Sequence, residues 1–296
     1  MSDQEKDIDQ PTGVETTGHE WDGIKELNNP LPRWWLWTFY ATIIWSVGYM
    51  VYYPAIPLIE GSTMGISGVT ARGNLKVEMD AADLARRDKV ALLAEQDITE
   101  VAKNEELVRF ATAGGSSLYK VNCSQCHGAA AQGGEGYPNL SDDDWLWGGD
   151  LEAIYITIAH GVRNDEDDDA RQSAMPAYGK DELLSREEVN AVAEYVLQIS
   201  GKEHDAALAG QGQATFAEQC SACHGENGKG IRDLGAPNLT DAIALYGSDR
   251  ESLRAQIWNP QQGAMPPWIA RLGDANIKQL AIYVHSLGGG EADKEE

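Results

Sequence analysis

The chain has 296 residues, 42% hydrophobic and 24% charged, which is the composition of an ordinary globular protein with about two domains. Its formal net charge of −24 excludes a general nucleic-acid binder, because contacts to phosphate require Lys and Arg. The charge fits a solvated acidic surface, or a surface that attracts a basic protein partner.

Residues 1–30 are polar and acidic, and we expect little packed structure there. The segment Asn-Pro-Leu-Pro-Arg at 29–33 then signals a turn followed by the start of a helix, with Pro32 near the first helical turn.

Residues 34–53 form an uncharged run of 20 residues. At 1.5 Å per residue, a helix of this length spans roughly the 30 Å hydrocarbon core of a membrane. Trp residues gather at one end of the run and Tyr residues at the other, as in the aromatic belts of spanning helices, and Pro54 and Pro57 end it. A cleaved signal peptide would have a shorter apolar core nearer the N-terminus. We therefore predict a single transmembrane anchor over residues 31–57, with residues 1–30 in the cytoplasm.

Residues 58–108 are predicted to be a periplasmic linker followed by helices. The part up to residue 75 is rich in Gly, Ser and Thr, which is typical of a flexible linker. Residues 76–113 are rich in Ala, Glu, Leu and Val, which indicates one or two helices.

An internal repeat covers nearly all of the remaining chain and predicts two similar helical domains, at 109–202 and 203–290. Each copy ends in a segment with one apolar helical face, at 189–196 and 277–284, and each of these segments contains a tyrosine, Tyr195 and Tyr283. The matched positions are Gly115, Tyr119, Cys123, Pro138, Trp147 and Met175 in the first copy, and Gly212, Phe216, Cys220, Pro237, Tyr246 and Met265 in the second.

Each copy contains a Cys-x-x-Cys-His motif, which is the signature of covalent haem c attachment. Two thiols form thioethers with the two vinyl groups of the haem, and the adjacent histidine is the proximal iron ligand. The motifs predict two covalently bound haem c groups, attached through Cys123, Cys126, Cys220 and Cys223, with His127 and His224 as proximal ligands.

Two other chemistries use paired cysteines. A structural zinc site needs four ligands, and no second Cys/His pair follows either motif. A thioredoxin-like redox pair needs a βαβ pattern, which is missing.

Met175 and Met265 each lie in an Ala-Met-Pro segment at the same place in the two copies, and we predict that they are the distal iron ligands. Met/His ligation raises the reduction potential of haem iron and fills its sixth position, which favours electron transfer over catalysis. Repeat logic pairs each methionine with the haem of its own copy, although a crossed arrangement remains open.

Several other residues near the motifs have an expected role. The carbonyl groups of Pro138 and Pro237 are expected to accept a hydrogen bond from the proximal histidines. Trp145, Trp147 and Tyr246 pack either on a haem edge or in the general core. His160, His204 and His285 have no counterpart in the repeat and are interpreted as ordinary residues.

Covalent haem attachment takes place on the outer side of bacterial energy-transducing membranes. We therefore expect residues 58–296 outside the inner membrane and the N-terminus inside. The positions of Lys25 and Arg33 before the apolar run favour the same orientation weakly.

The whole chain resembles the dihaem subunit III, of the FixP/CcoP type, of cbb3-type cytochrome c oxidase. The most specific resemblance lies in residues 19–24 (His-Glu-Trp-Asp-Gly-Ile) and 26–35 (Glu-Leu-Asn-Asn-Pro-Leu-Pro-Arg-Trp-Trp), before the apolar run. The resemblance implies a mainly α-helical protein with one transmembrane helix and two tandem class-I cytochrome c domains.

The resemblance also implies a role and partners. Such a subunit is not an enzyme on its own. It accepts electrons from a donor cytochrome c and relays them through a monohaem subunit to a catalytic haem b/copper subunit, which reduces oxygen and pumps protons. A free-standing membrane-tethered dihaem carrier and a dihaem peroxidase are the alternatives, and the matched methionines argue against the peroxidase.

Overall fold

The computed structural model describes residues 7–241 and 244–292, and expectations that fall on residues 1–6 lie outside this range. The chain divides into two compact units, residues 1–85 and 86–296. Each unit is described by itself.

A β-hairpin occupies part of the N-terminal segment for which we expected little structure. Strand β1 (Thr16–Trp21) pairs antiparallel with β2 (Ile24–Leu27), and Trp21 faces Ile24 across the turn. Asp22 and Gly23, the two turn residues, have φ of 50° and 84°. Such values are those of a two-residue type I′ turn, for which Asp-Gly is a preferred sequence. This hairpin was not predicted, although all of its strand residues except Thr16 and Leu27 are exposed.

The uncharged run forms helix α1 (Arg33–Tyr52), which begins directly after Pro32 as expected. None of its side chains is buried. Strands β3 (Pro57–Leu58) and β4 (Gly61–Ser62) follow as a short antiparallel pair. By mean hydropathy, the described part of the chain contains no helix that is long and apolar enough to cross a membrane. The predicted membrane span is therefore not confirmed.

Three helices occupy the region where one or two were predicted. They are α2 (Ala71–Glu95), α3 (Ile98–Ala102) and α4 (Glu105–Asn122). Asn104 caps α4, because its side-chain oxygen accepts hydrogen bonds from the N–H groups of Glu106 (3.0 Å) and Leu107 (3.2 Å). Residues 71–75, predicted as linker, already belong to α2.

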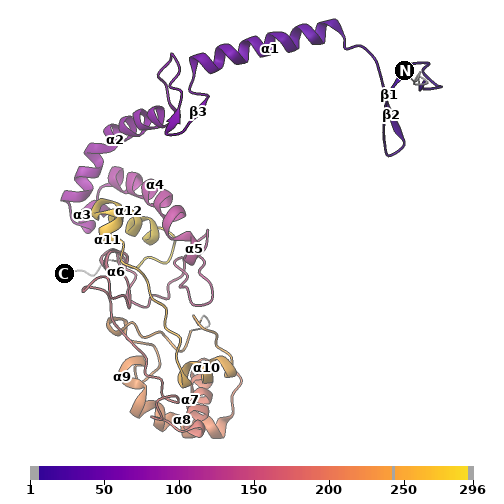
Figure 1. Cartoon of the computed structure of the whole chain (residues 1–296). Helices are drawn as coiled ribbons and strands as arrows, with labels where there is room; N and C mark the ends of the chain where they lie inside the picture. The colour runs from indigo at the N-terminus through magenta and orange to yellow at the C-terminus, as the bar shows by residue number, and fades with distance from the viewer. Residues whose placement is uncertain (1–6, 242–243, 293–296) are drawn as a thin grey trace. The chain divides into compact units, whose positions relative to one another are not determined.

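A first hydrophobic core forms around α4, and we call the group of helices that builds it the first lobe. It contains α3, α4, α5 (Ser124–His127), α6 (Leu151–His160), α11 (Ile269–Leu272) and α12 (Asp274–His285). The C-terminal helix α12 packs against α4 and α6 (Figure 1). Its apolar side chains Ile277 and Leu280 are at most 1% exposed. Burying a side chain of this size stabilises the fold by about 1.5–3 kcal/mol.

A second core is built by α7 (Arg186–Ile199), α8 (Ala206–Gln219) and α10 (Arg250–Trp258). We call these helices, together with α9 (Ser221–His224) and the short 3₁₀ helix η1 (Arg232–Leu234), the second lobe. Helix α7 packs against α8 and α10 (Figure 1). Buried Glu194 of α7 accepts hydrogen bonds from Arg250 of α10, which joins the two helices.

The two repeats exchange their closing helices. Helix α7 ends the first repeat but packs on α8 of the second, and α12 ends the second repeat but packs on α4 of the first. The aromatic contacts follow the same exchange, because Tyr119 lies 5.5 Å from Tyr283 and Phe216 lies 5.1 Å from Tyr195 between ring centroids. The boundaries at 109–202 and 203–290 thus describe the repeat in sequence, whereas each core draws on both copies.

Candidate functional site

The two Cys-x-x-Cys-His motifs adopt the same local backbone. Helices α4 and α8 end one residue before the first cysteine, and a single helical turn, α5 or α9, carries the rest of the motif. Cys123 has φ −112° and ψ −32°, and Cys220 has φ −114° and ψ −32°. The amide of each histidine donates to the carbonyl of that cysteine, at 2.9 Å for His127 and 3.0 Å for His224. The repeat in sequence is therefore a repeat in geometry.

The histidine of each motif is oriented by a proline carbonyl, as predicted. The distance from Nδ1 of His127 to the carbonyl oxygen of Pro138 is 3.0 Å, and the distance from Nδ1 of His224 to that of Pro237 is 3.1 Å. A carbonyl can only accept, so Nδ1 carries the proton and Nε2 keeps its lone pair. Burial lowers the pKa of both imidazoles, which favours the neutral form that binds iron.

The four cysteines are neither disulfide-bonded nor arranged as a zinc site. All four thiols are free. Among the described residues, neither set of two cysteines and a histidine has its ligand atoms gathered as a metal centre needs. Burial raises the pKa of Cys123 and Cys220 to about 11, with the second cysteine of each motif adding to the effect. Redox-active cysteines have lowered pKa values, so the thioredoxin-like alternative is disfavoured.

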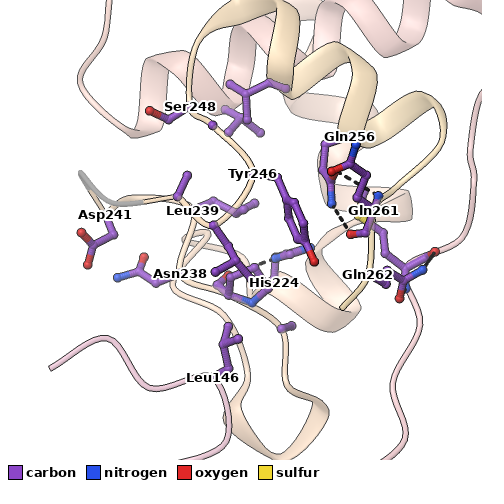
Figure 2. Close-up of a pocket in the computed structure, with 18 of the residues that line it drawn as sticks. Leu146, His224, Asn238, Leu239, Asp241, Tyr246, Ser248, Gln256, Gln261 and Gln262 are labelled. Carbon is purple, nitrogen blue, oxygen red and sulfur yellow. Dashed lines mark hydrogen bonds between the residues drawn. The ribbon is translucent and has the colours of Figure 1, made fainter. Parts of the chain in front are cut away.

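A cavity of about 740 Å³ lies beside the second motif. Cys220, Cys223 and His224 line it, as does Tyr246, whose ring lies close to the imidazole (Figure 2). This volume is within the range of about 300–1,000 Å³ that is usual for cofactor pockets. Haem c requires two thiols for covalent attachment, and an imidazole nitrogen and a thioether sulfur as iron ligands. Cys220, Cys223, His224 and Met175 offer these groups around one cavity, so the residues fit haem c.

The methionine that lines this cavity is Met175, from the other repeat. Its main chain is held by the side chain of Gln262, which accepts from the amide of Met175 (3.0 Å) and donates to its carbonyl (3.1 Å). Three residues on, the hydroxyl of Tyr178 donates to the carbonyl of Gln219 (2.6 Å), next to Cys220. The first repeat's Ala-Met-Pro segment is thereby fixed to the second lobe.

Met265 occupies the reciprocal place in the first lobe. It packs against the first core together with Cys123. The amide of Trp268 donates to the carbonyls of Ile158 (3.2 Å) and Ala159 (3.0 Å) at the end of α6. Each methionine thus lies in the lobe of the other copy's motif, which favours the crossed arrangement that the sequence left open.

The three aromatic residues that the sequence singled out lie in different parts of the structure. Tyr246 lines the cavity, whereas Trp145 packs on the first core and donates its indole N–H to the carbonyl of Gly289 (2.6 Å). Trp147 stacks with Arg171, whose guanidinium lies 5.3 Å from the ring centroid.

Three of the four histidines outside the motifs each have a hydrogen-bond acceptor nearby. His160 pairs with Asp167 (3.0 Å), His204 with the carbonyl of Lys202 and His285 with that of Glu291. His160 also lies in a group with Asp167 and Asp169 whose ligand atoms are within 4.8 Å of one another.

Sequence reasoning missed Gln262 and Arg163. Gln262 stands three residues before Met265, as Gln172 stands three residues before Met175, so the repeat was a signal that could have marked it. Arg163 lines the cavity but stands in sequence before a run of acidic residues, where it is indistinguishable from a surface charge.

Comparison with known families matches three consecutive parts of the chain. Residues 13–60 match the N-terminal domain of cytochrome oxidase-cbb3, FixP. Residues 112–200 match the cytochrome c family, and residues 207–284 match cytochrome c oxidase, cbb3-type, subunit III.

Relatives with curated descriptions align over nearly the whole chain. The Cbb3-type cytochrome c oxidase subunit CcoP of Cereibacter sphaeroides is 52% identical over 95% of this chain and 97% of its own length. The subunit FixP of Sinorhizobium medicae is 50% identical over 98% of this chain and 100% of its own length. The CcoP subunit of Azospirillum brasilense is 46% identical over 97% of this chain and 99% of its own length.

Proposed function

The chain belongs to the FixP/CcoP family of cbb3-type cytochrome c oxidase subunits, and we propose that it passes electrons from a donor cytochrome c towards the oxygen-reducing subunit of such a complex. As a member of that family it is an electron-transfer cytochrome with two covalent haem c groups. The observation that carries the proposal is the match over nearly the full length of chains that are themselves oxidase subunits.

We assign the haem contacts to the residues that the two lobes bring together. Cys123 and Cys126 attach one haem and Cys220 and Cys223 the other, while His127 and His224 are the proximal ligands. The distal ligands are crossed in this assignment: Met265 serves the haem on His127, and Met175 serves the haem on His224. Support comes from Met175 in the cavity of His224 and from Met265 in the core that contains Cys123.

When bound, each haem supplies an iron that takes up and releases one electron. The chain's own residues prepare the site for this change. Pro138 and Pro237 hold the imidazoles in one orientation, and Gln262 holds the backbone of Met175, so both ligands keep their places as the charge changes. Phe216 and Leu239 keep the surroundings of His224 apolar. A methionine sulfur, as the second protein ligand beside the imidazole, would raise the reduction potential of the iron.

The crossed assignment has a consequence for electron transfer between the haems. Residues near the first motif, including Tyr137 and Pro138, line the cavity of the second motif. The amide of Gly136 also donates to the carbonyl of Leu245 (2.8 Å). Backbone contacts and shared methionines hold the two sites in one unit, which favours transfer between them within the chain.

We propose that the catalytic haem b/copper subunit and the monohaem subunit of the oxidase are the partners; the relatives are themselves named as subunits of a cbb3-type cytochrome c oxidase. A further proposal is that α1 anchors the chain in the bacterial inner membrane, with the haem lobes outside. The absence of charge from Trp34 to Tyr53 and the lack of buried side chains in α1 support it. Protease accessibility of the N-terminus and of the haem lobes in sealed vesicles tests this topology: digestion of both from the same side would contradict it.

The experiment that tests the function is extraction of membranes in a mild detergent, followed by a native gel stained for haem and for oxidase activity. Migration in a large band that contains b-type haem and consumes oxygen is expected. Migration of the chain alone, with only c-type haem, would instead identify a free-standing tethered carrier.

A further inference from the structure

Arg163 is a half-buried cation at the wall of the cavity that holds His224 and Met175. Its Nε donates to the carbonyl of Gly263 (2.6 Å), and one Nη donates to the carbonyl of Ser173 (3.4 Å). Among the described residues, no carboxylate forms an ion pair with it, although burial lowers the pKa of its guanidinium and so disfavours its charge. A partly desolvated cation held only by neutral groups is costly unless an anion completes it.

The backbone at Arg163 is also unusual, because its φ is 47°, in the region that favours glycine. Strained residues of this kind persist where the surroundings fix them, and they gather at functional sites. The two residues whose carbonyls accept hydrogen bonds from Arg163 are themselves held in place. The amide of Gly263 donates to the hydroxyl of Tyr246 (2.7 Å), and Ser173 lies in the segment that leads to Met175. The guanidinium is thus set in one place within the cavity wall.

The other charges around the cavity indicate which kind of anion Arg163 would pair with. Its acidic lining residues are Glu135, Asp142, Asp144 and Asp241, and its second cation is Lys202. The ammonium of Lys202 donates to the carbonyl of Ser248 (3.1 Å). A haem c group carries two carboxylates on the edge away from its thioethers. In a cavity already lined by four acids, these carboxylates need a cation, and the planar guanidinium of arginine matches a carboxylate better than an ammonium does.

We propose that Arg163 is a positioning residue that pairs with a propionate carboxylate of the haem attached at Cys220 and Cys223. The proposal rests on the proposed placement of that haem between His224 and Met175. It assigns to the first repeat a second contact with the second repeat's haem, beside the distal methionine. The pair neutralises a negative charge close to the iron, which disfavours the more positive oxidised state and raises the reduction potential.

The test is a redox titration of the purified full-length protein with Arg163→Gln, Arg163→Lys, Lys202→Gln and Arg171→Gln. Arg171 is the matched control, since it is partly buried and bonded to neutral groups on Thr157 and Ala153 but does not line the cavity. The midpoint of the second haem is assigned with Met175→His, which must lower that midpoint. Failure of the Met175→His variant would overturn the ligand assignment, separately from the role of Arg163.

Arg163→Gln is expected to lower the reduction equilibrium constant of the second haem at least tenfold, about 59 mV for one electron. Arg163→Lys, which keeps the charge, and the two other variants are expected to change it less than threefold. The proposal is overturned if Arg163→Gln leaves that midpoint within threefold of wild type, if only the midpoint of the first haem falls, or if Lys202→Gln alone produces the fall. If a denaturing gel shows that the Arg163→Gln protein does not carry two haems, the Arg163→Lys protein is used instead. A tenfold fall in the reduction equilibrium constant of its second haem, although the positive charge is retained, also overturns the proposal.

Discussion

The main chains of Val162 and Met265 exchange two hydrogen bonds, with N···O distances of 3.0 Å and 2.9 Å. Val162 follows α6 of the first repeat, and Met265 belongs to the second. The pairing places the second repeat's methionine in the first lobe. Together with the bonds between Met175 and Gln262, it means that neither lobe is complete without residues of the other repeat.

The first repeat alone should therefore not form a native cytochrome lobe. A chain of residues 86–202 contains α4 and the first motif but lacks α12, whose side chains Ile277 and Leu280 fill the first core. We expect this fragment to lack cooperative unfolding and methionine ligation, whereas residues 86–296 retain both. Denaturant titration followed by circular dichroism measures the cooperativity of unfolding. The absorption band that arises from methionine bound to haem iron measures the ligation. A cooperatively folded fragment with a methionine-ligated haem would contradict the exchange.

A single methyl group at Gly212 should weaken the crossing of α7 and α8. A Cβ there would lie 2.0 Å from the carbonyl oxygen of Ala191, which is backbone and cannot turn aside. Overpacking of this kind costs about 1–3 kcal/mol, so Gly212→Ala should lower the free energy of unfolding by that amount.

Gly210 in the same helix is the matched control, because nothing lies within 4 Å of its Cβ position. Gly210→Ala should stabilise the chain by about 0.5–1 kcal/mol, since alanine loses less conformational entropy on folding. Equal effects of the two substitutions in denaturant unfolding would contradict the close helix crossing.

Exchanging each methionine for histidine should reveal which iron it binds. In a Cys123→Ala/Cys126→Ala variant only the haem on His224 is attached, and a haem-stained denaturing gel should show half the stain of wild type. In this background Met175→His should lower the reduction potential, because histidine replaces a ligand that favours the reduced iron. Met265→His should leave it unchanged. The reverse result in the redox titration would show that each methionine serves its own repeat.

Asp144 should make the chain less stable as the pH rises. Burial, with the charges of Asp241 and Asp142, raises its pKa from 3.8 to about 6. Between these values the folded chain binds more protons than the unfolded chain, so stability falls as the pH rises, and the loss is complete above about pH 6. Asp144→Asn should remove this loss and stabilise the chain on the order of 1 kcal/mol near pH 7.5, after allowance for screening by water.

The gain from Asp144→Asn should disappear near pH 4, where the native carboxyl is already protonated. Exposed Asp143 provides the neighbouring control, and Asp143→Asn should change little at either pH. Unfolding midpoints in denaturant at the two pH values measure both effects. A gain that is the same at both would show that proton binding by Asp144 is not its cause.

The chemistry of the site could be predicted from sequence because covalent attachment constrains neighbouring residues. The Cys-x-x-Cys-His spacing is local, so the motif alone predicts His127 and His224 as iron ligands. The hydrogen bonds to the proline carbonyls, which follow from the need to orient a metal-bound imidazole, are confirmed. The closing helices of the two copies were also legible from apolar periodicity.

The partners of the closing helices could not be predicted in the same way. Both α7 and α12 present a similar apolar face with a tyrosine in the same position, so Tyr195 and Tyr283 fit either lobe by pattern. The choice depends on tertiary contacts such as those of Gln262 and Trp268, which leave no periodic signal. Near the N-terminus, by contrast, the Asp22-Gly23 turn was a local signal for the hairpin that the acidic composition obscured.

In the proposed arrangement, the two haem sites exchange their distal methionines between the repeats. The most direct test is an experimental density map of the purified oxidase complex, in which the sulfur nearest the iron on His224 is identified. We expect this sulfur to belong to Met175, with Met265 at the iron on His127. A map in which Met265 and His224 bind the same iron would contradict it.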